Sequence, residues 1–148
     1  MLPYYIIIGI IAYLIGSVNF SILISKKKAG FDIREKGSGN AGTTNMLRSV
    51  GKGAALITLI LDILKGIISV LFSIFYGFVL YKIWNIHVDP AILVQISGIC
   101  VILGHTYPIY FGFKGGKGVA TALGILLITN WHIGLICLVF ALVLIIMT

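Results

Sequence analysis

The sequence predicts an all-α, polytopic integral membrane protein with about four to five membrane helices, one of them short or re-entrant, and two cytoplasmic Gly-rich loops. Two observations support this fold class. Hydrophobic residues make up 59% and charged residues 10% of the 148-residue chain, whereas soluble domains are about 25% charged. Uncharged stretches cover residues 1–25, 66–81, 90–113 and 118–148, and about twenty helical residues cross the roughly 30 Å core of a bilayer. We therefore expect residues 1–148 to form a single integral membrane domain.

The distribution of positive charge predicts the orientation of the chain. The net charge is +7, but the Lys and Arg residues concentrate after the first and third apolar stretches, and only Lys82 lies in the connection between the second and third. By the positive-inside rule, both basic segments face the cytoplasm and the N-terminus lies outside. The charge thus reports membrane topology, and no nucleic-acid partner is expected.

The first span is expected from about Leu2 to Ser25. Ser17, Ser21 and Ser25 recur every four residues near its inner end, which places their hydroxyl groups on one helical face. Such a face should point into a helix bundle rather than at lipid. Interhelical packing and a part in a binding site both remain open for these serines.

The second span, expected from Ala54 to about Tyr81, carries two charged residues, Asp62 and Lys65. Being three residues apart, they lie on the same helical face. Charges within a span are costly and mark either a functional site or a mutual ion pair. Both readings are open, and the pair could also brace the preceding loop from beneath.

The third span is expected from about Pro90 to Ile109, where Pro108 ends the helix because proline fixes φ and lacks an N–H. Val119 to Thr129 holds only about eleven apolar residues, about 16 Å of helix, so a short or re-entrant helix is expected there. The final run, from Ile133 to Thr148, is apolar to its last residue. We therefore expect the domain to be incomplete at its C-terminus.

Residues 37–53, GSGNAGTTNMLRSVGKG, form the first Gly-rich loop. Its five glycines allow φ > 0 and a close approach of the backbone to a ligand, and successive N–H groups in such a loop can bind an anion. Hydroxyl, amide and guanidinium donors complete a phosphate-binding set. The candidate phosphate-binding residues of this loop are Ser38, Gly39, Asn40, Gly42, Thr44, Asn45 and Arg48.

The second Gly-rich loop lies within residues 104–121 and repeats this chemistry with two lysines. It leads into the short apolar helix, whose N-terminal amides and positive dipole end favour a bound phosphate. The candidate phosphate-binding residues here are Lys114, Gly115, Gly116, Lys117 and Gly118.

Two nucleotide-binding motifs are excluded by their context. Gly37-x-Gly39-x-x-Gly42 matches the dinucleotide fingerprint, but no strand precedes it, as that motif requires. Neither Gly-Lys pair has the spacing of a Walker A loop. Cys100 and Cys137 lie within apolar runs and are expected to be buried small hydrophobic residues. No His and Cys cluster has zinc-ligand spacing, so neither a metal nor another cofactor is expected.

The two loops resemble the motifs of the bacterial acyl-phosphate:glycerol-3-phosphate acyltransferase family, known as PlsY. The matching blocks are residues 37–45 with Arg48 and residues 51–53, and Gly104-His105, Pro108 and residues 113–121. Asp62, Lys65 and Gly66 also match a family pattern, as does Gly16-Ser17. Family members are longer, and a third cytoplasmic motif of theirs has no counterpart before Thr148.

The resemblance implies transfer of a fatty acyl group from acyl-phosphate to the 1-hydroxyl of glycerol 3-phosphate, which gives lysophosphatidic acid for phospholipid synthesis. It implies a multi-pass protein of the bacterial plasma membrane with its site facing the cytoplasm. The candidate catalytic residues are His105 and Asn45. His105 is the only candidate protein base near the site, and orienting a loop or a phosphate is the role expected for it ahead of base catalysis. The His-x4-Asp pair of another acyltransferase class is absent, so catalysis is expected to rest on positioning and charge stabilisation. A membrane transporter for phosphorylated anions and an inactive truncated fragment are the alternative functions.

Overall fold

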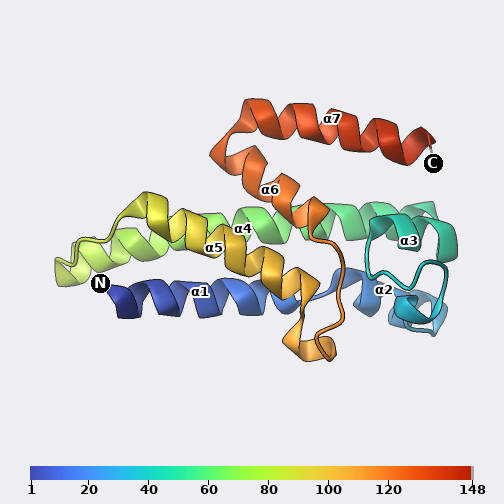
Figure 1. The fold of residues 1–148 in the computed structure, drawn as a ribbon, viewed down its shortest axis with the longest axis horizontal. Helices are drawn as coiled ribbons and strands as arrows, with labels where there is room; N and C mark the ends of the chain where they lie inside the picture. The colour runs from blue at the N-terminus through green and yellow to red at the C-terminus, as the bar shows by residue number, and fades with distance from the viewer. Residues whose placement is uncertain (148) are drawn as a thin grey trace.

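The structure, a computed structural model, describes residues 1–147 and the side chains of residues 1–143. Every regular element in residues 1–147 is a helix, and loops connect the helices (Figure 1). The α-helices are α1 (Leu2–Ser17), α2 (Phe20–Ala29), α3 (Thr43–Ser49), α4 (Lys52–Trp84), α5 (Pro90–Thr106), α6 (Val119–Thr129) and α7 (Trp131–Met147), and the two 3₁₀ helices are η1 (Ile33–Glu35) and η2 (Ile109–Phe111).

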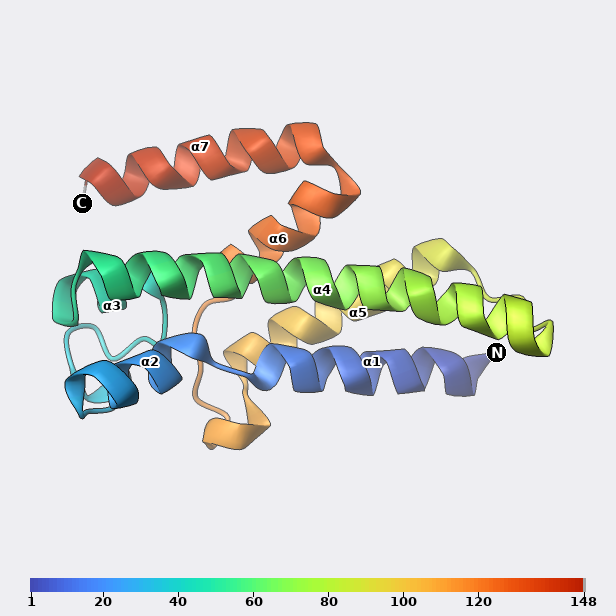
Figure 2. The same cartoon turned by 180° about the vertical axis from the view of Figure 1, so that it is seen from behind.

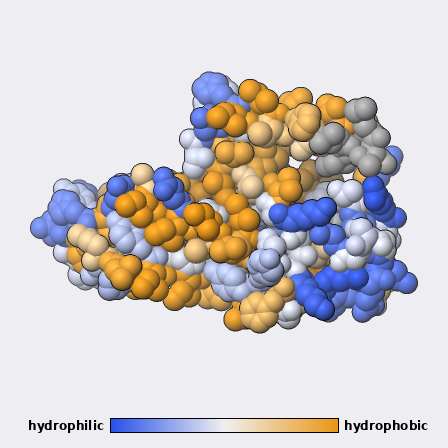
Figure 3. All heavy atoms as spheres, viewed as in Figure 1, coloured by the Kyte–Doolittle hydropathy of each residue, from blue (hydrophilic) through white to orange (hydrophobic). Residues whose placement is uncertain are grey.

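Three helical segments are long and apolar enough to cross a membrane: Leu2–Ala29, Lys52–Trp84 and Pro90–Phe111. Figure 1 shows α1, α4 and α5 running along one another, with the N-terminus at one end of the bundle and α2 and α3 at the other. Exposed apolar side chains cover the middle of the bundle, and hydrophilic residues gather at the end formed by α2, α3 and their loops (Figure 3). The predicted class, an all-α multi-pass membrane protein, is therefore confirmed.

Small residues bring α1 and α5 into close contact. A Cβ atom at Gly16 would collide with the carbonyl oxygen of Val101, and one at Gly104 with that of Tyr13. Small residues are favoured at such helix–helix contacts in membranes because they allow the backbones to approach closely. This packing places the end of α5, and with it His105, beside the end of α1.

The first span is not one continuous helix, contrary to the sequence prediction. It breaks at Val18 and Asn19, where Val18 is extended with φ −69° and ψ 105°. Asn19 begins α2 as its N-cap, because its side-chain oxygen accepts a hydrogen bond from Ile22 N at 3.2 Å. The predicted inward face is confirmed, since Ser17, Ser21 and Ser25 are all fully buried.

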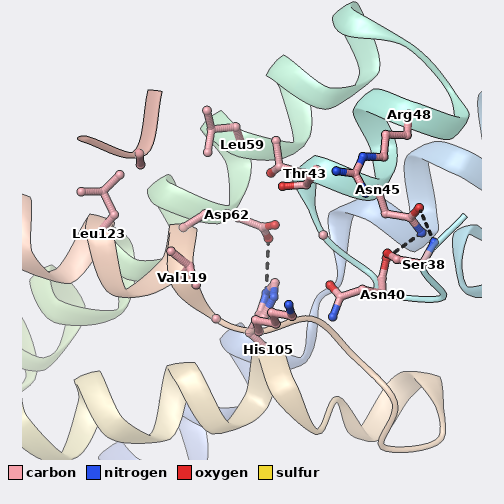
Figure 4. Close-up of a pocket in the computed structure, with 16 residues that line it drawn as sticks. Ser38, Asn40, Thr43, Asn45, Arg48, Leu59, Asp62, His105, Val119 and Leu123 are labelled. Atoms are coloured by element: carbon pink, nitrogen blue, oxygen red, sulfur yellow. Dashed lines mark hydrogen bonds and ion pairs between the residues drawn. The ribbon is translucent and has the colours of Figure 1, made fainter. Parts of the chain in front are cut away.

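The first loop contains a helix that the sequence reading did not predict. The seven residues of α3 pack onto α4 through Met46, which is fully buried in a cluster with Ile22 and Ile33. Such a short helix depends on tertiary packing rather than on intrinsic propensity. Its position turns Thr43 and Arg48 toward the site described below (Figure 4), and Thr44 lines the same site.

The short helix predicted for Val119–Thr129 is confirmed as α6 with the same bounds. It packs closely on α4, because a Cβ atom at Gly66 would collide with Thr121 O and one at Gly124 with Ile63 O. After Asn130 the chain reverses, and α7 returns alongside α6 toward the end of the molecule that carries α3 (Figure 2).

Candidate active site

A pocket of about 350 Å³ lies where the two Gly-rich loops meet the helical bundle. The first loop and α3 form one side, and the start of α6 forms another, while α4, α5 and α7 supply the remainder (Figure 4). Its lining residues are Ser38, Asn40, Gly42, Thr43, Thr44, Asn45, Arg48, Leu59, Asp62, His105, Lys117, Gly118, Val119, Ala120, Leu123 and Ala141.

The pocket brings together most of the residues proposed from the sequence. Those that line it are Ser38, Asn40, Gly42, Thr44, Asn45, Arg48, His105, Lys117 and Gly118. Those outside its lining are Gly39, Lys114, Gly115 and Gly116. Residues 38–48 of the first loop and residues 117–118 of the second, which are at least 69 positions apart in the sequence, thus contribute to one cavity.

Arg48 and Lys117 give the pocket its positive charge. Arg48 lies in the last turn of α3 and Lys117 directly precedes the N-cap of α6. Both side chains are exposed, and neither forms an ion pair with a carboxylate of the described residues. A guanidinium and an ammonium group without carboxylate partners are suited to the oxygens of a phosphate.

The start of α6 adds main-chain donors to this side of the pocket. Gly118 is its N-cap in the left-handed conformation, with φ 76°, and no side chain caps the helix. The N–H groups of the first helical turn have no intrahelical acceptor. Because Val119 and Ala120 line the pocket, their amides are available to an anion there.

Asn45 organises the first loop through its buried side chain, which is 2% exposed. Its amide nitrogen lies 3.0 Å from each of three carbonyl oxygens, those of Ile33, Lys36 and Asn40. Its amide oxygen accepts a hydrogen bond from Ser38 N at 3.1 Å (Figure 4). The contacts of Asn45 are therefore those of a residue that holds the loop in shape, rather than of a group left free to react.

Asp62 and His105 form the buried polar floor of the pocket. Asp62 is 1% and His105 3% exposed. His105 Nδ1 lies 3.6 Å from Asp62 Oδ1 (Figure 4), and the same carboxylate oxygen lies 2.9 Å from Lys65 Nζ. The sequence left open an ion pair or a place in a functional site for Asp62 and Lys65. The ion pair is present, and Asp62 also lines the pocket.

Gly115 and Gly116 attach the second loop to the end of α5. Gly115 N donates to Thr106 O at 3.0 Å and Gly116 N to His105 O at 3.2 Å, which satisfies carbonyl groups at the end of α5. A Cβ atom at Gly116 would collide with the His105 ring. The amides of both glycines are thus occupied by main-chain acceptors and hold the second loop against His105, while their part in binding a phosphate stays a prediction.

Two sequence-based expectations concern metals and cysteines. In residues 1–143 no group of three or more His, Cys, Asp or Glu side chains is placed to hold a metal ion. Cys100 and Cys137 are free thiols of intermediate exposure, so they are less buried than the sequence reading implied.

Fold and pocket together define a polytopic membrane protein with a cationic pocket at one end of its helical bundle. The chain belongs to the glycerol-3-phosphate acyltransferase family, whose model matches residues 6–148.

Curated relatives agree with this assignment. The chain is 46% identical over 140 residues to the glycerol-3-phosphate acyltransferase of Clostridioides difficile (strain 630). This match covers 94% of this chain and 66% of the relative. It is 46% identical over 129 residues to that of Paraburkholderia phytofirmans, covering 87% of this chain and 57% of the relative. The chain thus spans about three fifths of the length of these relatives.

Two crystal structures of PlsY (YgiH), an integral membrane glycerol 3-phosphate acyltransferase, share the fold. The glycerol 3-phosphate form has a TM-score of 0.72 at 40% identity, and the lysophosphatidic acid form 0.67 at 38%. Each comparison covers 89% of this chain and 60% of the crystallised one.

Proposed function

We propose that the protein transfers a fatty acyl group from acyl-phosphate to the 1-hydroxyl of glycerol 3-phosphate and so makes lysophosphatidic acid for phospholipid synthesis. Membership of the family supports this proposal, as do the related structures described as glycerol 3-phosphate and lysophosphatidic acid forms. Both substrates carry a phosphate group and one carries an acyl chain. The site must therefore offer cations and an apolar surface together.

The observation that carries the proposal is that Arg48 and Lys117 line one pocket from separate loops. On its other side the same pocket has an apolar wall, formed by Leu59, Val119, Leu123 and Ala141. A water-soluble phosphorylated substrate and an acyl donor in the bilayer can meet in such a cavity. The cations bind the phosphates, and the apolar wall receives the acyl chain where it joins the reactive carbonyl carbon.

In the proposed reaction the 1-hydroxyl oxygen attacks the carbonyl carbon of the acyl-phosphate. A new ester C–O bond forms, the bond from that carbon to the phosphate oxygen breaks, and inorganic phosphate leaves with the hydroxyl proton. Because the donor is already activated, the contribution of the protein is to position both substrates and to stabilise negative charge. Arg48 and Lys117 supply that charge stabilisation, while His105 and Asp62 shape the floor on which the glycerol part rests.

The proposed orientation places the N-terminus outside and the pocket at the cytoplasmic face of the bacterial plasma membrane. It is supported by the concentration of Lys and Arg at the end of the bundle that holds the pocket. Cysteine probes introduced at positions 36, 87 and 115 of a variant lacking Cys100 and Cys137 test it. An impermeant external thiol reagent should label position 87 and not the other two, and equal labelling of all three would contradict it.

Acyl transfer itself is tested with purified protein in lipid nanodiscs, labelled glycerol 3-phosphate and a long-chain acyl-phosphate. Labelled lysophosphatidic acid should form with acyl-phosphate. The same protein in sealed vesicles should not accumulate labelled glycerol 3-phosphate. Accumulation of glycerol 3-phosphate without product would favour a transporter instead. If the protein shows neither acyl transfer nor accumulation, the proposed function is refuted for this chain.

A further inference from the structure

We propose that Arg34 is a positioning residue that ties the second Gly-rich loop to η1, the segment just before the first Gly-rich loop, and thereby holds Lys117 at the pocket. This inference rests on the proposed function for its kinetic consequence, but its structural consequence is independent of any activity. Arg34 lies in η1, outside the residues that line the pocket.

The guanidinium group of Arg34 contacts Asp32 at the start of η1 and the second Gly-rich loop at once. Nε and Nη2 donate to the two carboxylate oxygens of Asp32, at 3.0 and 2.8 Å. Nη1 donates to Phe111 O at 2.7 Å and to Lys114 O at 3.0 Å. These hydrogen bonds join residues about eighty positions apart in the sequence.

Arg34 is not available to bind a substrate phosphate, because these contacts use four of the five N–H donors of its guanidinium group. Asp32 also neutralises it: the Arg34 guanidinium group holds the pKa of the Asp32 carboxyl well below its usual range. Asp32 is fixed in turn, since its Oδ1 accepts from Arg34 N and its Oδ2 lies 3.2 Å from Lys26 Nζ. The two remaining contacts of the Arg34 guanidinium group are hydrogen bonds to the main-chain carbonyl groups of Phe111 and Lys114.

The segment that Arg34 holds is a turn that needs support. Gly112 and Phe113 both have positive φ, 65° and 60°, and a bulky non-glycine residue in that conformation is strained. Arg34 binds the carbonyl groups on either side of this pair, those of Phe111 and Lys114. It therefore fixes the turn in the form from which the chain continues into Gly115, Gly116 and Lys117.

Lys117 lies three residues beyond the last Arg34 contact. Between them, Gly115 and Gly116 attach the loop to the end of α5. The position of Lys117 thus depends on two successive sets of contacts: the hydrogen bonds from Arg34 (the Arg34 clamp), and those of Gly115 and Gly116 with the end of α5. If the hydrogen bonds from Arg34 to Phe111 O and Lys114 O are lost, the strained turn at Gly112 and Phe113 can relax. The backbone that leads into Gly115 and Gly116 then changes direction.

A double-mutant cycle tests the kinetic consequence. Lys117→Ala and Arg34→Ala should each lower kcat/KM for glycerol 3-phosphate by about tenfold or more, mainly through a higher KM. The double variant should be little worse than the poorer single variant, since residues that act through one another are not additive. Arg34→Lys should recover only part of the loss, because an ammonium group cannot reproduce the guanidinium geometry. Multiplicative losses in the double variant would overturn the proposal.

Limited proteolysis provides a readout that needs no activity and also serves if the proposed function fails. Trypsin should cleave after Lys114 and Lys117 about tenfold faster in detergent-solubilised Arg34→Ala protein than in wild type, and the increase should be smaller in Arg34→Lys protein. Cleavage after Lys82, at the other end of the bundle, reports global unfolding and should keep its rate. Lys28→Ala, which removes an exposed charge outside the clamp, is the matched control and should behave as wild type. Unchanged cleavage after Lys114 and Lys117 in both Arg34 variants would refute the clamp.

Discussion

Lys65 Nζ lies 2.9 Å from Asp62 Oδ1, one helical turn away on α4, and both residues are buried within a membrane span. The same ammonium group donates to Gly16 O at 3.2 Å and Val18 O at 2.9 Å. These two carbonyls lie at the break between α1 and α2. The buried ammonium group of Lys65 therefore neutralises the Asp62 carboxylate beneath the pocket. It also donates hydrogen bonds to main-chain carbonyl groups at the break in the first span.

Replacing Lys65 with Met should strongly destabilise the protein. It leaves Asp62 as an uncompensated buried charge and deprives the helix break of its donor, and breaking a buried pair costs about 3–5 kcal/mol. Thermal unfolding in detergent measures the effect, with Lys82→Met as an exposed control. The double variant Asp62→Asn/Lys65→Met should recover part of the lost stability. A Lys65→Met protein as stable as wild type would show that the pair is dispensable.

Asn45→Asp distinguishes a loop-organising role from direct catalysis. The substitution places a carboxylate against the carbonyl oxygens of Ile33, Lys36 and Asn40 in place of a donor. We expect a loss of about 1–3 kcal/mol in unfolding free energy together with reduced acyl transfer. Ser49→Ala, which removes only a 3.3 Å bond to Asn45, should change little. A lower kcat at unchanged stability would instead support Asn45 as a catalytic residue.

The sequence was most informative where local patterns determine structure. The bounds of α6 follow from an apolar run between Gly118 and Asn130, and residues of the two cationic Gly-rich loops, each predicted to bind a phosphate, line one pocket. The features it missed depend on contacts between distant residues. The break at Asn19 is stabilised by Lys65, and α3 is held by the burial of Met46. The clamp formed by Arg34 becomes visible only when its partners on the second loop are placed.

The ion pair of Asp32 predicts how stability depends on pH at the loop end of the molecule. The folded-state pKa of Asp32 is lowered, chiefly by its hydrogen bonds with Arg34. The group thus stabilises the fold fully above its unfolded pKa of about 3.9, and this contribution is lost as the pH falls from there toward the folded pKa. Unfolding measured from about pH 5 down to about pH 2, the range over which the contribution is lost, should show less acid sensitivity in Asp32→Asn protein, which lacks the contribution at every pH. Equal acid sensitivity of variant and wild type would show that the Asp32 ion pair does not contribute to the pH dependence of stability.

Arg48→Ala should lower kcat/KM for acyl transfer by tenfold or more, on the order of 1.4 kcal/mol, because it removes a pocket guanidinium that has no carboxylate partner among the described residues. Arg48→Lys should recover only part of the activity, since it keeps the charge and loses bidentate geometry. Lys52→Ala is a matched control, because Lys52 is exposed at the start of α4 and does not line the pocket. Full activity of Arg48→Ala at subsaturating substrate would remove Arg48 from the site.

The glycines of the two loops should tolerate alanine very differently, for reasons that differ from one position to the next. At Gly116 a Cβ atom would collide with the His105 ring, and at Gly115 with His105 O. At Gly39 the backbone has φ +72° and the added atom would lie 3.5 Å from Arg34 O, an ordinary van der Waals contact, so alanine there should cost roughly 1 kcal/mol of strain without a steric clash. At Gly42 the added atom would meet Asn40 Oδ1 at 3.0 Å, a contact that a side-chain movement can relieve.

We therefore expect a graded series when each glycine is replaced singly by alanine. Gly115→Ala and Gly116→Ala should lose acyl transfer most steeply, because both displace the second loop from His105 and carry Lys117 with it. Gly39→Ala and Gly42→Ala should retain more activity. Gly53→Ala, where nothing lies within 4 Å of the added atom, should match wild type and is the control. Steady-state kinetics on protein with normal membrane insertion measures the series, and near-normal activity of both Gly115→Ala and Gly116→Ala would mean that the second loop is only a connector.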